Sequence, residues 1–237
     1  MNRNIILSAD GSHTIAITEL GVTYHSHHGA VQESRHVFLE AGLQHILDKR
    51  LVTDGPLRIF EMGFGAGLNA LLTALAAQHL QTSIHYTAVE TAPLGPKETD
   101  ALNYSAVLGG AAFFQKIHHC LWNREAVIHP HFVLHKQQLP LQEFNAQYRF
   151  HLVYFDAFAP ATQPELWTET IFKKLFGLMH PGGVLVTYCS KGAVRRALQA
   201  AGFIVEKIPG PPGKREMVRA TASYRQAPAH FATFFIF

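Results

Sequence analysis

The sequence predicts an α/β protein with a doubly wound, mostly parallel β-sheet, and two observations lead to this fold class. Short apolar segments rich in β-branched and aromatic residues alternate along the chain with longer segments of helical spacing, which is the β-α-β order of parallel sheets. The predicted strands look buried and do not alternate apolar with polar residues, as expected when helices cover both faces of a sheet. Apolar residues make up 48% of the 237 residues, so a sizeable core is available.

The repeated units begin at residue 57. Residues 57–80, LRIFEMGFGAGLNALLTALAAQHL, predict a strand, a glycine-dense turn and a helix, and a second strand follows over 83–90. The remaining elements that we expect are strands over 126–136, 149–156 and 182–190, helices over 165–179 and 193–203, and closing strands around 203–208, 216–224 and 230–237.

The first fifty residues do not follow this order. HTIAITELGVTYHS (13–26) predicts a hairpin that turns at Leu20-Gly21, and residues 32–50 predict an amphipathic helix. The sequence shows no internal repeat and no long linker. We therefore expect one domain, 1–237, with an N-terminal extension over 1–52 and a Rossmann-like core over 53–237.

Several classes of protein are disfavoured by composition. No apolar run approaches the roughly 18 residues of a membrane helix. The N-terminus has only a three-residue apolar run with acids soon after, so we expect no secretory signal. Cys120 and Cys189 lie far apart, which argues against a disulfide framework and fits a reducing compartment. The expected location is cytoplasmic.

Charge is distributed unevenly along the chain. Residues 1–172 contain 10 lysine or arginine residues and 15 acids, whereas residues 173–225 contain 10 lysine or arginine residues and 2 acids. A basic segment of this kind is typical of a surface that binds a polyanion, most often nucleic acid. Charge alone leaves a solvated basic face as an equal alternative.

Residues 61–69, EMGFGAGLN, place an acid and three glycines where the first core strand ends and a helix begins. Glycines there let the backbone approach a ligand, and the helix N-terminus offers free N–H groups. Leu68 stands where the dinucleotide motif G-x-G-x-x-G requires its third glycine, so a nicotinamide dinucleotide is a weaker interpretation. A purely structural loop is the third alternative.

Two acids flank this loop. Glu61 precedes the first glycine by two residues, and Glu90 ends the second predicted strand. A carboxylate at the first position suits a cofactor with a cationic amino-acid end, whereas it would repel a pyrophosphate. Glu90 is placed to accept both ribose hydroxyls. Together the loop and the acids favour S-adenosylmethionine as the cofactor.

The segment VYFDAFAPATQPELW (153–167) ends a buried strand on Asp156. Ligands of doubly wound sheets bind beyond the carboxyl ends of the strands, so Asp156 is expected to face the methyl donor. The alternative is an acid that only caps the strand or a helix. Pro160 and Pro164 disfavour that alternative, because they make the next residues a shaped loop.

Five segments carry a resemblance to a known family: YHSHHGAVQESRHVFLEAGL (24–43), EMGFGAGLN (61–69), DAFAPATQPELWT (156–168), SKGAVRRALQAAGF (190–203) and GKREM (213–217). The pattern D-x-F-A-P-x-x-x-P-E-x-W is the most specific of them. With these segments the chain resembles the methyltransferase domain of the MnmC family, which completes the 5-methylaminomethyl group on the wobble uridine of certain bacterial tRNAs.

The resemblance implies a seven-stranded, Rossmann-like sheet of the class I S-adenosylmethionine-dependent methyltransferase type. It also implies N-methylation of 5-aminomethyl-2-thiouridine to 5-methylaminomethyl-2-thiouridine in the anticodon stem-loop of tRNA. Bifunctional members carry a flavin oxidase after this domain. Because this chain ends at Phe237, we expect methyl transfer alone, with a separate oxidase supplying the aminomethyl substrate.

The cofactor-binding residues that the resemblance implies are Glu61, Gly63, Phe64, Gly65, Gly67, Asn69, Glu90 and Asp156. Many relatives of this fold hold the adenine amine with an acid after the third strand. This chain has HKQQL (135–139) there, so Gln137 or Gln138 is expected to replace the acid by hydrogen bonding. No metal is expected, because the histidines 118, 119, 129 and 131 are irregularly spaced and lack acid or thiolate partners.

Asp156 is the predicted catalytic residue: it would bind the acceptor amine and receive its proton, while the site holds nitrogen, methyl and sulfur in line. The loop residues Phe158, Pro160 and Trp167 are expected to meet the substrate, although Phe158 and Trp167 could instead pack beneath the loop, which we favour for Trp167. The residues expected to contact anticodon-stem phosphates are Lys191, Arg195, Arg196, Lys214 and Arg215.

Two other functions are left open. A methyl or aminopropyl transferase acting on a small amine would also place an acid after the fourth strand, but the basic segment disfavours it. A catalytically silent RNA-binding protein of the same fold is disfavoured because Glu61, Glu90 and Asp156 are all present.

Overall fold

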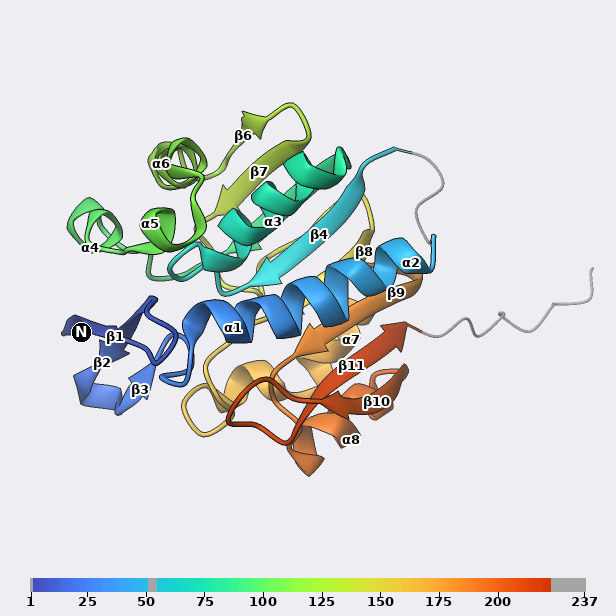
Figure 1. Cartoon of the computed structure of the whole chain (residues 1–237). Coiled ribbons are helices and arrows are strands. Elements are labelled where there is room, and N and C mark those ends of the chain that lie inside the picture. Colours follow the sequence, from blue (N-terminus) through green and yellow to red (C-terminus); the bar gives the residue numbers. More distant parts are fainter. Residues whose placement is uncertain (1, 51–54, 223–237) are drawn as a thin grey trace, which may run out of the picture.

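A large twisted β-sheet organises the computed structural model, which describes residues 2–50 and 55–222 (Figure 1). Its strands are β4 (Leu57–Met62), β5 (Ile84–Val89), β6 (Arg124–His129), β7 (Phe132–Gln137), β8 (Phe150–Phe155), β9 (Met179–Thr187), β10 (Phe203–Pro209) and β11 (Glu216–Ala222). Among the described residues the order is β10-β11-β9-β8-β4-β5-β7-β6. The five central strands pair in parallel, and β6, β10 and β11 join by antiparallel pairing.

The predicted fold class is confirmed, with one strand more than the seven expected. The segment 126–136, predicted as one strand, reverses direction and forms the antiparallel pair β6 and β7. Pro130 lies at the reversal, and since proline has no N–H to donate to a ladder, a continuous strand is disfavoured there. The predicted strand over 230–237 lies outside the described residues.

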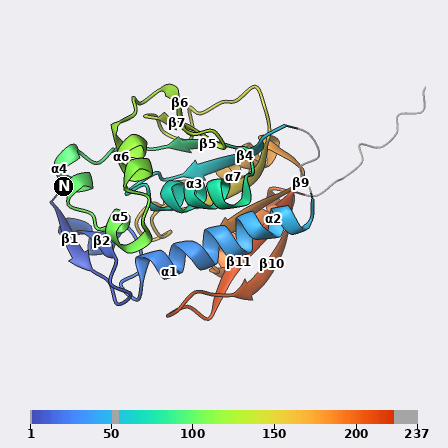
Figure 2. The ribbon, with the colours of Figure 1, turned by 45° about the horizontal axis from the view of Figure 1, so that its top comes forward.

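Helices cover both faces of this sheet (Figures 1 and 2). One layer holds α3 (Leu68–Leu80), α6 (Ala111–His119) and a long helical run made of α1 (Ala30–Ser34), the π-helical η2 (Arg35–Gln44) and α2 (His45–Asp48). The other layer holds α7 (Glu169–Gly177) and α8 (Gly192–Ala200). Two short helices, α4 (Pro96–Asp100) and α5 (Tyr104–Leu108), follow β5.

The central strands are largely apolar because successive side chains enter two different cores. On β4, Ile59 packs under the layer of α3 and the long helix, whereas Phe60 packs under the layer of α7 and α8. On the neighbouring strand β8, Tyr154 and Phe155 divide in the same way. This double burial fixes the register of the central strands and therefore the place where each strand ends.

The N-terminal residues form a small antiparallel sheet of β1 (Arg3–Leu7), β2 (His13–Ile17) and β3 (Val22–Thr23). The predicted hairpin is present, because β2 pairs with β3 through the turn η1 (Thr18–Leu20) and Gly21. The strand β1 was not predicted. Figure 1 shows this sheet beyond the amino-terminal end of α1, beside the point of the β4 arrow, which marks the carboxyl end of that strand.

The long helix lies against the sheet at Gly42, which sits over β8 and β9. A Cβ atom built on Gly42 would lie 3.1 Å from Val186, 3.2 Å from Tyr154 and 3.3 Å from Leu152. The absence of a side chain thus allows the helix to approach the strands closely.

We predict that Gly42→Leu lowers the free energy of unfolding by about 2 kcal/mol or more, because its side chain overpacks this contact. Gly177→Leu is the matched control, since a Cβ atom on Gly177 meets nothing within 4 Å. Urea unfolding of both variants measures the difference. Equal stability of the two variants would show that the helix does not rest on the sheet at Gly42.

Candidate active site

The predicted site residues converge at the carboxyl ends of three neighbouring parallel strands. The glycine turn 63–67 follows β4, Glu90 follows β5, and Asp156 follows β8, with β4 between the other two strands. Backbone hydrogen bonds tie these ends together: Gly63 N–H donates to Val89 O at 3.1 Å, and Asp156 N–H donates to Met62 O at 3.0 Å. The convergence follows from the parallel topology, which brings these carboxyl ends to one edge.

A cavity of about 300 Å³ opens at this edge, and we call it the donor cavity. Its floor includes Gly63, Gly65, Glu90 and Asp156, all predicted from the sequence. The predicted residue Phe64 also lines it, although most of this ring is buried against Trp122 and His118 on the far side of the loop.

The glycines of the turn are required by close approaches within the protein. Gly63 has φ +89°, and a Cβ atom there would lie 2.8 Å from the backbone oxygen of Asp156. Gly65 has φ +48°, and its Cβ atom would lie 3.2 Å from the ring of Tyr24. Gly67 has φ +68° and precedes α3. Positive φ angles disfavour every other residue type, so this backbone shape depends on the three glycines.

Glu90 holds the floor of the donor cavity together. One carboxylate oxygen accepts the N–H of Gly65 at 3.1 Å, and the other accepts the N–H groups of Thr91 and Ala92 at 2.8 and 2.9 Å. The acid therefore joins the glycine turn to the segment after β5 and orients the lining of the cavity.

Asn69 connects the other two acids. Its side-chain amide nitrogen donates to Glu61 Oε1 at 3.0 Å and to Asp156 Oδ2 at 2.9 Å. Glu61 has no exposed surface and does not line the donor cavity. The structure thus places Glu61 beneath the turn, where it acts on the site through Asn69.

Burial controls the charge of both carboxylates. Removal from water raises the pKa of Asp156 to about 7; Glu33 adds to this rise, whereas the bond from Asn69 and the charge of Lys214 oppose it. Burial also raises the pKa of Glu61 well above its usual value, and the nearby carboxyl of Asp156 adds to that effect. Asp156 therefore changes its charge near neutral pH.

A second cavity of about 320 Å³ adjoins the first, and we call it the acceptor cavity. Asp156, Phe158 and Tyr24 line both cavities, with the rings of Phe158 and Tyr24 in edge contact at 5.3 Å between centroids. Tyr188, Glu33 and Lys214 line only the acceptor cavity of the two. Asp156 thus stands where the two cavities meet.

The proline-containing loop after Asp156 is fixed by hydrogen bonds. Phe158 donates its N–H to Gln163 Oε1 at 2.9 Å and accepts the indole N–H of Trp167 at 2.8 Å. Trp167 is only 6% exposed and packs on Phe155. The structure therefore places Trp167 beneath the loop, while Phe158 faces the cavities and Pro160 is half-buried at the loop's turn.

The N-terminal sheet and α1 supply residues that we did not predict: Arg3, Tyr24, His25 and Glu33. Arg3 donates to Ala92 O at 2.7 Å and pairs with Glu98 at 3.3 Å, which attaches β1 to the segment after Glu90. The sequence could have indicated Tyr24, His25 and Glu33, because they lie in the segment 24–43 that carries the family resemblance. Position along the chain did not indicate that this segment folds over the strand ends.

The predicted basic residues fall into two groups. Within the described part of the chain, Lys191, Arg195, Arg196 and Arg215 take part in no ion pair, and they lie at the start of α8 and on the β10–β11 loop. Lys214 instead pairs with the buried Glu33 inside the acceptor cavity.

Gln137 lies at the end of β7, outside the lining of both cavities, and its side-chain amide contacts His135 at 3.2 Å. No group of three metal-binding side chains occurs among residues 2–50 and 55–222. Within the same residues, no helix has the length and apolar character needed to span a bilayer.

Known proteins resemble this chain in sequence. Residues 124–223 match a family described as S-adenosyl-L-methionine-dependent methyltransferase. The chain is 34% identical over 223 residues to the tRNA 5-methylaminomethyl-2-thiouridine biosynthesis bifunctional protein MnmC of Ectopseudomonas mendocina, covering 88% of this chain and 33% of that protein. The protein of the same name from Idiomarina loihiensis is 30% identical over 237 residues, which is 92% of this chain and 38% of that protein.

The chain is similar to the methyltransferase part of MnmC over most of its length. It spans about a third of the length of these curated relatives. The predicted enzyme class, an S-adenosylmethionine-dependent methyltransferase, and the predicted cofactor are confirmed by the family match.

Two solved structures support the fold. The crystal structure of MNMC2 from Aquifex aeolicus has a TM-score of 0.71 at 22% identity, covering 93% of this chain and 70% of that chain. Spermidine synthase from Thermotoga maritima has a TM-score of 0.55 at 12% identity, covering 93% of this chain and 68% of that chain.

The raised pKa of Asp156 predicts a stability that depends on pH. The folded protein keeps a proton on Asp156 up to about pH 7, whereas the unfolded chain loses it near the usual value of 3.8. The contribution of Asp156 to the free energy of unfolding is therefore complete below about pH 4 and is lost as the pH rises to about 7. Relative to Asp156→Asn, the wild type should lose about 4 kcal/mol over this range, measured by urea unfolding at several pH values. If the difference in stability between wild type and Asp156→Asn does not change with pH, the raised pKa of Asp156 is wrong.

Glu90→Gln should weaken binding of S-adenosylhomocysteine by about tenfold or more, because an amide nitrogen would face the N–H groups of Thr91 and Ala92 or of Gly65. Calorimetry measures the affinity, and Glu98→Gln, which changes an acid further from the glycine turn, is the control. Unchanged affinity of the Glu90 variant would remove this residue from the donor site.

Proposed function

We propose that the chain transfers a methyl group from S-adenosylmethionine to the primary amine of a 5-aminomethyl group on the wobble uridine of tRNA. The observation that carries this proposal is the position of Asp156, whose carboxylate lies at the junction of the donor and acceptor cavities. A carboxylate there can contact an amine on one side while the methyl donor occupies the other side.

The donor cavity fits the cofactor of the family. Gly63 and Gly65 bring no side chains to the cavity floor, and Glu90, fixed by three backbone N–H groups, presents carboxylate oxygens to a ribose. S-adenosylmethionine supplies an electrophilic methyl group on a sulfonium. The residues that would hold it are Gly63, Gly65, Glu90 and the buried Phe64, with Asn69 holding Asp156 beside them.

The acceptor nitrogen needs a free lone pair. Alkylammonium groups have pKa values near 10, so at neutral pH the amine arrives protonated. Asp156, with a pKa of about 7, is ionised enough to accept an N–H hydrogen bond and to receive the proton. The bond from Asn69 fixes the orientation of this carboxylate, which favours an in-line approach of the amine.

The tRNA substrate is supported by basic residues at the start of α8 and on the β10–β11 loop, and by the relatives. Lys191, Arg195, Arg196 and Arg215 supply positive charge that no acid of the described residues neutralises in an ion pair. Such residues bind phosphates with little choice of sequence. The relatives are named for tRNA 5-methylaminomethyl-2-thiouridine biosynthesis. With a tRNA substrate, we expect the reaction to take place in the cytoplasm, after an oxidase has exposed the amine.

Labelled S-adenosylmethionine tests the proposal. The protein is incubated with tRNA that carries the 5-aminomethyl group, with the same tRNA lacking it, and with spermidine or putrescine. We expect label in the first tRNA alone, identified by nucleoside mass spectrometry as the methylaminomethyl product. Label in the polyamines but not in tRNA would establish the small-amine function instead, and binding of tRNA without any transfer would indicate a silent RNA-binding protein.

Asp156→Asn should lower the single-turnover rate of methylation by roughly 10²–10⁴, because an amide cannot receive the proton. The wild-type rate should rise with pH and level off above about pH 7, where Asp156 is ionised. The rate of the variant should keep rising above pH 7, because it depends on amine that is already deprotonated in solution, so its deficit should be largest at low pH. Affinity for tRNA should be unchanged and serves as the control. A near-normal rate with both substrates saturating would reduce Asp156 to a structural role.

Arg196→Ala and Arg215→Ala should each weaken binding to all tRNAs alike and flatten the plot of log affinity against log salt by about one unit. Filter binding at several salt concentrations measures this slope. Arg219→Ala is the matched control, because Arg219 is engaged in a pair with Glu206 at 2.6 Å. A slope equal to that of the wild type would remove the mutated arginine from the interface.

A further inference from the structure

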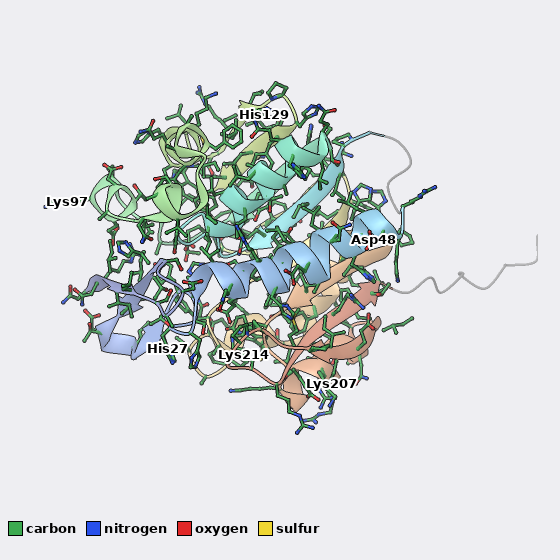
Figure 3. All side chains as sticks on the ribbon, in the orientation of Figure 1. His27, Asp48, Lys97, His129, Lys207 and Lys214 are labelled. Atoms are coloured by element: carbon green, nitrogen blue, oxygen red, sulfur yellow. The ribbon has the colours of Figure 1, made fainter. Side chains whose placement is uncertain are left out.

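The acceptor cavity already contains a primary ammonium group that belongs to the chain itself. The Nζ atom of Lys214 pairs with Glu33 Oε1 and lies 4.0 Å from the ring centroid of Tyr188. Figure 3 shows Lys214 below α1, on the hairpin of β10 and β11. A cation is thus held between a carboxylate and an aromatic face, which is a combination suited to ammonium recognition.

The walls around this cation are fixed from several elements. Glu33, on α1, is buried and accepts the N–H of Ser26 at 2.8 Å through its second oxygen. The hydroxyl of Tyr188, just after β9, donates to Ala157 O at 2.9 Å, which sets the plane of its ring beside the Asp156 loop. Both walls are therefore held by hydrogen bonds that do not involve Lys214.

Two further groups direct this cavity toward a polar ligand. His25 lines it, is 8% exposed, and has a buried Nδ1 atom without a hydrogen-bond partner. Asp156 lines the same cavity on the side of the methyl donor. An amine that enters this space would find the carboxylate of Glu33, the ring of Tyr188 and the carboxylate of Asp156 along its path.

We propose that Glu33 and Tyr188 form the ammonium subsite for the acceptor, and that the Lys214 ammonium occupies this subsite until the acceptor amine displaces it. The inference rests on the proposed function for its choice of an amine as acceptor. Lys214 is a primary alkylammonium, as is the protonated aminomethyl group, so each satisfies the same partners. Asp156 then takes the amine from this subsite for the reaction.

The loop that carries Lys214 links this displacement to binding of the polyanion. Arg215 is the next residue, is exposed, and has no ion-pair partner among the described residues. A phosphate bound by Arg215 acts on the same turn that holds Lys214 in the cavity. Binding of the substrate backbone and emptying of the subsite therefore involve one short loop.

Removal of the lysine side chain tests the subsite directly. Lys214→Ala leaves the buried Glu33 carboxylate without its cation, so the melting temperature should fall by about 2 °C or more. Addition of n-propylammonium chloride should raise the melting temperature of this variant in a saturable way, because the small cation fills the vacated place. Equal concentrations of sodium chloride measure the effect of salt alone. No saturable rise in Lys214→Ala would overturn the proposal.

Two variants control this experiment. Lys207→Ala removes a lysine of the same hairpin that pairs with Glu216 at the surface, at 2.8 Å, and should show no propylammonium effect beyond that of salt. Lys214→Ala combined with Glu33→Gln removes the subsite's carboxylate and should lose the effect. A response of equal size in either control would show that the cation acts elsewhere, and would contradict the subsite.

Activity separates this inference from the proposed function. Propylammonium should inhibit methylation of tRNA by Lys214→Ala, competitively with tRNA, and should inhibit the wild type at least tenfold less. If Lys214 instead contacts a phosphate, the KM of the variant for tRNA should rise and depend less on salt concentration, and propylammonium should have no effect. This result would overturn the inference. Absence of tRNA methylation by the wild type overturns the proposed function, whereas the melting experiment still reports on the ammonium subsite.

Discussion

The side-chain amide of Asn69 holds two carboxylates from neighbouring parallel strands at once, and the geometry of the site depends on this contact. Glu61 lies under the glycine turn and Asp156 faces the cavities, and both accept from the same nitrogen. Asn69 itself is buried in the first turn of α3, so its position is set by the helix that follows the glycines. Strand ends, turn and helix therefore fix the orientation of Asp156 together.

The same arrangement explains why Asp156 titrates near neutral pH. Burial and the nearby acid Glu33 favour the protonated carboxyl, whereas Asn69 and Lys214 favour the carboxylate. The opposing effects leave the pKa at about 7, where a carboxyl can exchange a proton with an amine at modest cost. A fully exposed aspartate at this position would be a much weaker base.

The N-terminal residues form the wall of the site that faces the ends of the strands. Tyr24 closes over Gly65, and Arg3 attaches the small sheet to the segment after β5. The long helix brings Glu33 to the acceptor cavity while its middle packs on β8 and β9 through Gly42. The segment that departs from the β-α order thus supplies one wall of both cavities.

The sequence by itself determined the parallel core and the edge of the sheet at which the chemistry lies. Apolar strands followed by a glycine turn, Glu90 and Asp156 predict that edge, because parallel strands end on one side. Local pattern also indicated that Trp167 packs beneath its loop. These features depend on periodicity and on residues close together in the chain.

Only the tertiary structure decided which of these residues contact one another. Glu61 reaches the site through Asn69, Lys214 pairs with Glu33 from α1 instead of standing free on the surface, and 126–136 folds as two strands. The two partners of the Lys214 pair are 181 residues apart in sequence. Their meeting depends on how a long helix and a distant hairpin pack against one sheet, which no local pattern encodes.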